Sequence, residues 1–437
     1  MVVLKNFVNI FYIPELRKKL FFTLGILIVY RLGSHIPVIG VDVNALQQLI
    51  DRAKGLGGLF SYLDMFSGGA LNRCTLFALG ISPYITASIM MQMLGMTIPY
   101  LEQLLKEGEY GRKIINQYTR YLAFGVSIMQ SIAFAIFLER NNLVLDPGWG
   151  FRLIFVLSLT VGGMFVMWLG EQISLFGLGN GSSMLVFAGI VARFPHDVNN
   201  TIYQVREGFM DPMVAIFVLI SFIVLSACVV FMERGERKVP VQYTRRMVGQ
   251  RMYSAQSSYI PFKINPANVM PVILATAFLQ FPLFVITMLS EKYEIFKTLA
   301  QAMSTSGVLF NVLQTALIIL FAYVYTAIAV NPEELAENMK KSGGFIPGIR
   351  PGKKTAEFVN YILTRLGLVG ALYLSVLALM PNIIYNLIQF HYTLSGTALL
   401  IVVGVGLDIA AQIESYLIEH RYEGFLSTGR LKGRLAR

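Results

Sequence analysis

Residues 213–232 read MVAIFVLISFIVLSACVVFM, and residues 233–238, which follow directly, read ERGERK. The first stretch holds no charged residue over 20 positions, which is about the length that an α-helix needs to cross the hydrocarbon core of a bilayer. The second stretch places Arg234, Arg237 and Lys238 just beyond the end of that helix. Basic residues accumulate in the cytoplasmic loops of membrane proteins. These residues therefore predict a membrane-spanning helix that leads into a cytoplasmic loop.

The rest of the chain has the same apolar character. Hydrophobic residues make up 55% of the 437 residues and charged residues only 14%, whereas a soluble chain carries about a quarter charged residues. The apolar runs recur from residue 20 to residue 415 rather than in one segment. This composition predicts an all-α multi-pass membrane protein and excludes a soluble enzyme.

Ten stretches are long and apolar enough to be predicted as transmembrane helices, whose backbone groups are satisfied within the helix itself. The fifth is short and flanked by glycines. The predicted spans are residues 20–39, 73–96, 119–138, 151–170, 183–196, 213–232, 270–290, 308–330, 366–387 and 394–413.

The charge of alternate loops predicts the orientation. One set of segments holds 26 basic residues and comprises residues 1–19, 99–120, 171–182, 233–268, 331–365 and 414–437. The other set holds 7 and comprises residues 34–60, 139–150, 193–212, 291–306 and 388–393. Because basic loops stay in the cytoplasm, both termini are expected there, and the net charge of +11 reflects these loops.

The spans divide into five and five. The expected organisation is an N-terminal half over residues 1–196, an external connection over 197–212, a C-terminal half over 213–413 and a basic cytoplasmic tail over 414–437. Because each half crosses the membrane an odd number of times, the second half enters the membrane from the side opposite to the first. This arrangement permits inverted repeats, although the halves show no visible sequence similarity.

Residues suited to catalysis or cofactor binding do not cluster in the sequence. Cys74 and Cys228 both lie in apolar runs, so neither a disulfide nor a thiolate metal site is expected. The four histidines are far apart. Residues 348–355 resemble a phosphate-binding loop only superficially, because Pro347 and Lys354 stand where that motif needs glycine and a hydroxyl residue. No metal, no cofactor and no enzymatic activity are predicted.

Two predicted cytoplasmic loops are unusually long and basic, at residues 233–268 and 331–365. Their charge could serve only to anchor the neighbouring helices. Anchoring needs just a few charges beside each helix end, however, and loops of this length more often carry function. An exposed basic surface suits an acidic partner such as RNA or an acidic face of a soluble protein.

The segment from about residue 60 to residue 73 does not fit a plain ten-helix pattern. It is moderately apolar, too short to span a bilayer and interrupted by Gly68 and Gly69. Such a segment either lies on the outer surface as an interfacial helix or re-enters among the helices, where protein or water can satisfy its backbone. Composition leaves both possibilities open.

A small-solute secondary transporter is an alternative of a different class. It would need charged side chains or broken helices near the middle of the membrane. The predicted spans are nearly free of carboxylates, since Glu171, Asp408 and Glu414 lie near the inner helix ends. A membrane scaffold is a third possibility, which the segment at 60–73 and the basic loops disfavour.

Several motifs together resemble the SecY family, in its bacterial form. Residues 64–73 read DMFSGGALNR and residues 77–89 read FALGISPYITASI. Further matches, in the family's order, are WLGEQI at 168–173, GNG at 179–181, AQS at 255–257, NP at 331–332, KKSG at 340–343 and GIRPG at 348–352. The resemblance covers nearly the whole chain.

This resemblance implies a protein-conducting channel built from two five-helix inverted pseudo-repeats around a central pore. Secretory polypeptides would cross the plasma membrane through it, and hydrophobic segments would leave sideways into lipid. A plug closing the outer side would comprise Asp64, Met65, Phe66, Ser67, Gly68, Gly69, Ala70, Leu71, Asn72 and Arg73. An apolar pore ring would comprise Ile81, Ile85, Val186, Ile190, Ile273 and Ile401.

The resemblance also implies a lateral gate and partners. The gate would lie between the second and third spans on one side and the seventh and eighth on the other. Its polar candidates are Gln92, Ser127, Gln130 and Thr276. A SecA motor or a ribosome would dock on the basic loops, and Arg350 would couple the channel to the motor. The docking residues would be Arg237, Lys238, Arg245, Arg246, Arg251, Lys340, Lys341 and Arg350. A SecE-like and a SecG-like membrane subunit would accompany the chain.

Overall fold

The structure is a computed structural model of the full chain. It describes residues 13–43, 45–46, 64, 67–208, 211–243, 247–248, 251–252, 257–289, 298–299, 302, 307–388 and 396–428. These residues form two compact units. The first unit comprises residues 1–199 and 405–437, and the second comprises residues 200–404.

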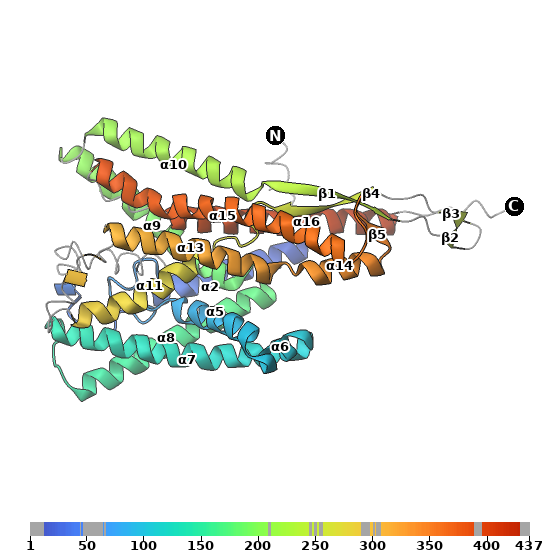
Figure 1. Ribbon diagram of the computed structural model, residues 1–437. Helices are drawn as coiled ribbons and strands as arrows, with labels where there is room; N and C mark the ends of the chain where they lie inside the picture. The colour runs from blue at the N-terminus through green and yellow to red at the C-terminus, as the bar shows by residue number, and fades with distance from the viewer. Residues whose placement is uncertain are drawn as a thin grey trace. The chain divides into compact units, whose positions relative to one another are not determined.

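Each of the ten predicted spans coincides with a long helix (Figure 1). The helices are α2 (Pro14–Gly33), α5 (Ser82–Thr97), α7 (Glu109–Arg140), α8 (Trp149–Phe176), α9 (Gly181–Arg206), α10 (Pro212–Glu233), α11 (Met270–Leu289), α13 (Val308–Ala329), α15 (Lys353–Ile388) and α16 (Gly396–Thr428). The all-α, multi-pass prediction is therefore confirmed. Two short helices, α6 (Pro99–Lys106) and α14 (Pro332–Lys341), precede α7 and α15.

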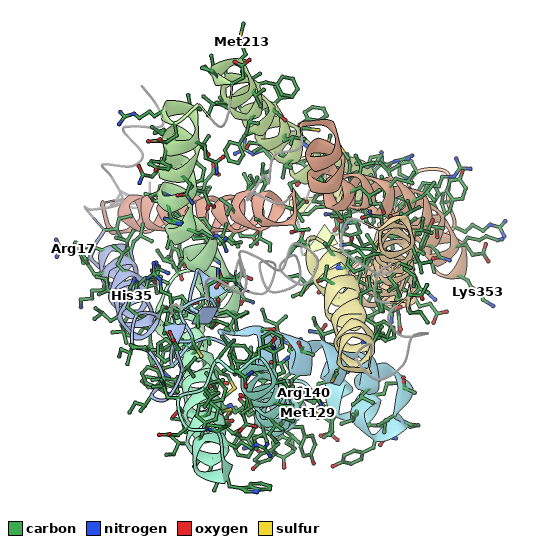
Figure 2. All side chains as sticks on the ribbon, turned by 90° about the vertical axis from the view of Figure 1, so that its left-hand side faces the viewer. Arg17, His35, Met129, Arg140, Met213 and Lys353 are labelled. Atoms are coloured by element: carbon green, nitrogen blue, oxygen red, sulfur yellow. The ribbon has the colours of Figure 1, made fainter. Side chains whose placement is uncertain are left out.

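Among the described residues, six helical segments are long and apolar enough to cross a membrane by length and composition. α10 is the most apolar of these, and its large side chains Ile216, Phe217 and Phe231 are exposed. Figure 2 shows Met213, also exposed, projecting from the first turn of this helix. A helix that is apolar on all sides with few protein neighbours is suited to lipid.

In the first unit, α7 packs between α5 and α8, and α2 packs on α8. Figure 1 shows α7 and α8 side by side. Their contact contains a core of Phe134 and Leu138 from α7 with Phe155 and Leu159 from α8. Cys74, fully buried, belongs to the same core and fixes the chain that leads into α5.

The final part of α16 also belongs to the first unit. Gln412 accepts a hydrogen bond from the backbone N–H of Gly179 at 2.8 Å. Lys19, near the start of α2, contacts the hydroxyl group of Tyr416 and lies 4.4 Å from the centre of its ring. These contacts tie α2, the turn before α9 and the end of α16 together.

Several predicted helix boundaries are wrong, among them the end of the first span, which was expected at residue 39, whereas α2 ends at Gly33. Two others show the physical reason. The second span was expected to begin at residue 73, but residues 74–81 form turns and a bridge between Pro37 and Thr75, and α5 begins at Ser82. Pro83 favours this later start, because proline is well suited to the first turn of a helix and not to its interior. The fifth span was expected to end at residue 196, but α9 continues to Arg206 although Pro195 lies inside it. The predicted span ends where polar residues begin, whereas a helix can continue through polar residues.

In the second unit, α13 packs on α11 and on α15. The two long basic loops contain strands that the sequence analysis did not predict: β1 (Glu236–Tyr243), β2 (Met247–Val248), β3 (Arg251–Met252), β4 (Ser257–Lys263) and β5 (Gly344–Phe345). β1 pairs antiparallel with β4, so that Val239 faces Ile260, and with β5 through Gln242 and Phe345.

This sheet, in the order β4-β1-β5, forms a small core with α14 and the first turns of α15. Val239 and Val241 point into it from β1, Met339 from α14 and Val359 from α15. We call β1, β4, β5, α14 and the first turns of α15 the loop domain. The two basic loops thus fold against each other.

Candidate functional site

The predicted plug segment, residues 64–73, is organised around the carboxylate of Asp64. Its Oδ1 accepts a hydrogen bond from the backbone N–H of Asn72 at 3.0 Å and a longer one from Ser67 Oγ at 3.4 Å. The backbone N–H of Gly69 donates to the carbonyl of Asp64 at 3.1 Å. The carboxylate therefore closes the loop between residues 64 and 72. Met65 and Phe66 lie outside the described residues.

Contacts from α2 and α9 hold this segment within the first unit. Arg193 Nη1 on α9 donates to Asp64 Oδ2 at 2.8 Å. On α2, Arg31 Nη1 donates to the carbonyl of Gly68 at 3.1 Å, and the hydroxyl group of Tyr30 donates to the carbonyl of Ser67 at 3.4 Å. The contacts come from two helices that are far apart in sequence.

Much of the described part of the plug segment is also buried, although Arg73 is exposed. Asp64 is 1% exposed, and Ala70 and Leu71 are buried as well. Gly68 lies so close to α9 that a Cβ atom on it would be 2.8 Å from the Cα atom of Gly189. Of the two possibilities that composition leaves open, the geometry corresponds to a segment lodged among the helices of its own unit and not to a surface helix.

Sequence reasoning missed the partners of the plug segment. None of these partners, Tyr30, Arg31, Gly189 and Arg193, was predicted as a site residue. The available signal was Arg193 itself, a charge within the last turn of the predicted fifth span, residues 183–196. Charged residues within or beside membrane spans are rare and commonly functional.

Four of the six predicted pore-ring residues belong to the first unit. Ile81, at the start of α5, and Val186 and Ile190, on α9, are buried, while Ile85 on α5 is half-buried. Ile81 packs towards α8, since a Cβ atom on Gly170 would lie 3.1 Å from its Cδ1. In the second unit, Ile273 on α11 is half-buried and Ile401 on α16 is buried. Their assembly into one ring stays a prediction.

The predicted gate residues differ in their surroundings. Gln92 on α5 is exposed and Gln130 on α7 is half-buried. Ser127 on α7 is buried and faces α8, where a Cβ atom on Gly163 would lie 3.1 Å from its Oγ. Thr276 on α11 donates to the carbonyl of Val272 at 3.0 Å. Ser127 is thus a packing residue between two neighbouring helices in this structure.

The docking candidates that the structure describes are mostly exposed cations on the loop domain. Arg237 and Lys238 lie on β1, and Lys238 Nζ is 4.7 Å from the centre of the Tyr259 ring. Lys340 and Lys341 end α14, and Lys341 pairs with Glu337 at 3.0 Å. Arg245 and Arg246 lie outside the described residues, and for Arg251 the structure gives only its place in β3.

Arg350 is exposed and sits in a well-defined turn before α15. Its carbonyl accepts a hydrogen bond from Thr355 Oγ1 at 2.9 Å, and Thr355 is buried. Ile349, beside it, packs against the core of the loop domain. The backbone is therefore fixed while the guanidinium group remains available to a partner.

Within the described ranges, no group of three or more His, Cys, Asp or Glu residues is arranged to hold a metal ion. The plug segment carries one buried ion pair, the pore-ring residues are aliphatic, and the loop domain presents cations.

Comparison with known proteins gives consistent results at the level of sequence. The family model for SecY matches residues 75–410. Protein translocase subunit SecY of Thermus thermophilus is 44% identical over 443 residues, covering 99% of this chain and 100% of the relative. Protein translocase subunit SecY of Escherichia coli K12 is 42% identical, and the match covers 96% of each chain.

Solved structures show the same fold. A structure described as a protein conducting channel matches with a TM-score of 0.62 at 17% identity, over 93% of this chain and 96% of that one. Sec61 from a canine ribosome–channel complex matches with a TM-score of 0.57 at 17% identity, over the same shares of the two chains. At this level of identity the likeness concerns the fold alone.

Proposed function

The chain belongs to the SecY family of protein translocase subunits, and from this premise we propose that it forms the protein-conducting channel of a bacterial Sec translocon. Unfolded secretory polypeptides pass outward through it, and hydrophobic segments leave sideways into the lipid. The observation that carries the proposal is the 44% identity to a translocase subunit over 99% of this chain. The chain itself performs no chemistry, and energy comes from a partner.

The pore ring is proposed to seal around arbitrary substrates. A translocating polypeptide presents every type of side chain, so specific polar contacts cannot serve it. An aliphatic collar adheres weakly to every type of substrate side chain and resists wetting when it is empty. The proposed collar comprises Ile81, Ile85, Val186, Ile190, Ile273 and Ile401. The plug segment, held by α2 and α9, adds a second closure.

Partners are proposed for two surfaces. The exposed cations of the loop domain suit a SecA-type motor or the ribosome, because both phosphate and acidic protein surfaces attract basic residues. Two structural relatives, canine Sec61 and yeast Ssh1, are described in complexes with ribosomes. The exposed apolar face of α10 is open to lipid or to the SecE-like and SecG-like subunits that the family resemblance implies.

The proposed location is the plasma membrane, with both termini in the cytoplasm. The support is the distribution of basic residues, 26 in one set of loops and 7 in the other. The alternative of a small-solute transporter is not favoured by relatives that are named as protein translocase subunits. The proposed gate, at Gln92, Ser127, Gln130 and Thr276, remains part of the same hypothesis.

Crosslinking to a substrate in transit tests the channel directly. A photoreactive residue is placed at position 85, 190 or 401, and membranes are supplied with SecA, ATP and an arrested secretory precursor. Adducts at all three positions that depend on the signal sequence are expected. A matched probe at Phe217, on the exposed face of α10, should give none. Adducts at position 217 alone, or none anywhere, would contradict the proposed path.

A further inference from the structure

Arg193 has no part in the proposed pore ring, gate or docking surface, yet among the described residues it forms a 2.8 Å ion pair with the plug segment, a shorter contact than those that α2 makes with it. We propose that Arg193 is a positioning residue that latches the plug segment to α9, and that its ion pair with Asp64 must break before the segment can leave its seat. This inference rests on the proposed function, because the latch has a purpose only in a channel that opens.

The carboxylate of Asp64 has two roles at once. Its Oδ1 accepts from the backbone N–H of Asn72 and so shapes the loop, while its Oδ2 accepts from Arg193 Nη1 at 2.8 Å and ties the loop to α9. The Asp64 side chain is 1% exposed and that of Arg193 is 19% exposed. Water therefore screens the pair poorly, and separating two charges in such surroundings is costly.

Asp197 gives Arg193 a second counter-ion on its own helix. Its Oδ1 lies 3.7 Å from Arg193 Nε, one helical turn further along α9. When Asp64 moves away with the plug segment, the guanidinium group remains beside a carboxylate. Opening then costs the contact with Asp64 without leaving the half-buried Arg193 unpaired. This arrangement suits a contact that must break and form again.

The chain contains a natural reporter of the plug segment's position. Cys74 directly follows the segment and is fully buried in the core that it shares with Leu71 and Ala78. Its thiol can react with a maleimide only when this part of the chain moves. The other cysteine, Cys228, is exposed on α10 and is replaced by serine in all variants, so that Cys74 is the single target.

The test measures the rate at which a water-soluble maleimide labels Cys74 in isolated membranes that contain the full chain. Asp64→Asn is the main variant, because an asparagine Oδ1 can still accept from Asn72 and Arg193 keeps Asp197. Arg193→Gln removes the other partner. Each is expected to raise the labelling rate about tenfold, the ratio that corresponds to the loss of one moderate interaction. Arg193→Lys retains the charge and is expected to stay close to the parent.

The double variant Asp64→Asn/Arg193→Gln distinguishes a latch from two independent effects. If the two residues act through one contact, the double variant labels no faster than the faster single variant. Rates that multiply in the double variant would overturn the proposal, and so would an unchanged rate in Asp64→Asn. Should Arg193→Gln fail to accumulate in membranes, Asp64→Asn and Arg193→Lys still decide the question.

The same membranes separate this inference from the proposed function. Precursor crosslinking at positions 85, 190 and 401 is measured beside Cys74 labelling. If adducts form but the labelling rate of Cys74 is the same in Asp64→Asn and in the parent, the channel proposal is supported and the latch is contradicted. Faster labelling in Asp64→Asn without adducts in any variant would show that the ion pair holds the segment, but it would contradict the proposed channel path.

Discussion

At Gly68 the backbone of the plug segment approaches the backbone of α9 closely. Gly68 has φ +67° and Gly69 has φ +90°, so both adopt a conformation that favours glycine. Their surroundings differ. A Cβ atom on Gly68 would lie 2.8 Å from Gly189 Cα and 2.9 Å from its carbonyl oxygen, whereas a Cβ atom on Gly69 would meet nothing within 4 Å. Two adjacent glycines thus form a matched pair for a substitution experiment.

Gly68→Ala is expected to displace the plug segment, while Gly69→Ala is expected to leave it seated. Both substitutions carry the strain of a left-handed alanine, roughly 1–2 kcal/mol, but only the first adds a clash with backbone atoms that cannot rotate away. The measurement is the resting ion conductance of the reconstituted channel in a planar bilayer. We expect a higher conductance for Gly68→Ala. Equal conductances would show that strain in the loop, and not the seat on α9, controls closure.

The Asp64–Arg193 pair also shows what local sequence reasoning cannot provide. The two residues are 129 positions apart, and each has an ordinary local explanation, Asp64 as a turn residue and Arg193 as a charge at a helix end. Their pairing depends on how α9 folds back onto the segment. The motif at residues 64–73 predicts the plug segment, but nothing local to it indicated which helices would contact that segment.

At the scale of elements, the basic loops carry a pattern that the sequence analysis overlooked. In β1 the buried residues Val239 and Val241 alternate with the exposed Lys238, Pro240 and Gln242. This alternation is typical of a strand with one buried face. The charge of these loops predicted surfaces for partners and drew attention away from the strands. The helices are easier to predict because a long apolar run is a local property.

Val241→Asp is expected to unfold the loop domain, whereas Gln242→Asp on the same strand is expected to be tolerated. Val241 is 1% exposed, and a carboxylate without a partner in its place would destabilise the domain by about 3 kcal/mol or more. Gln242 is exposed, and its replacement should change stability by only about 0.5 kcal/mol. Limited proteolysis in membranes measures the effect as cleavage within residues 236–263. Similar cleavage of both variants would mean that the sheet does not stabilise the loops.

At the scale of the whole molecule, the number of spans and the family could be predicted, because both depend on signals spread along the chain. Each of the ten helices carries its own apolar run, and the family motifs occur in order. The helix ends could not be predicted as well, since α9 extends past the apolar window to Arg206. The exposed apolar side chains of α10 could be predicted from its composition, because such a helix is suited to lipid. The packing of one basic loop against the other could not, because it depends on strand pairing between residues far apart in the sequence.

Arg350 is proposed to couple the whole channel to a SecA-type motor. Arg350 is exposed, and its turn is held by the hydrogen bond from Thr355 to the Arg350 carbonyl and by the packing of Ile349 on the core. A change of the Arg350 side chain therefore alters the surface and not the fold. Arg350→Glu reverses the charge that an acidic motor surface would contact. Export driven by SecA and ATP is expected to fall at least about tenfold, equivalent to about 1.4 kcal/mol of lost interaction.

The control for Arg350→Glu is Arg112→Glu, the same charge reversal at an exposed position near the start of α7. It changes the net charge of the chain equally, so any loss that it shares with Arg350→Glu reflects general electrostatics and not a specific contact. Membrane insertion of both variants should match that of the parent chain. If Arg350→Glu exports at the parent rate, or if Arg112→Glu is equally impaired, Arg350 does not couple the motor, and docking must depend on the other cations of the loop domain.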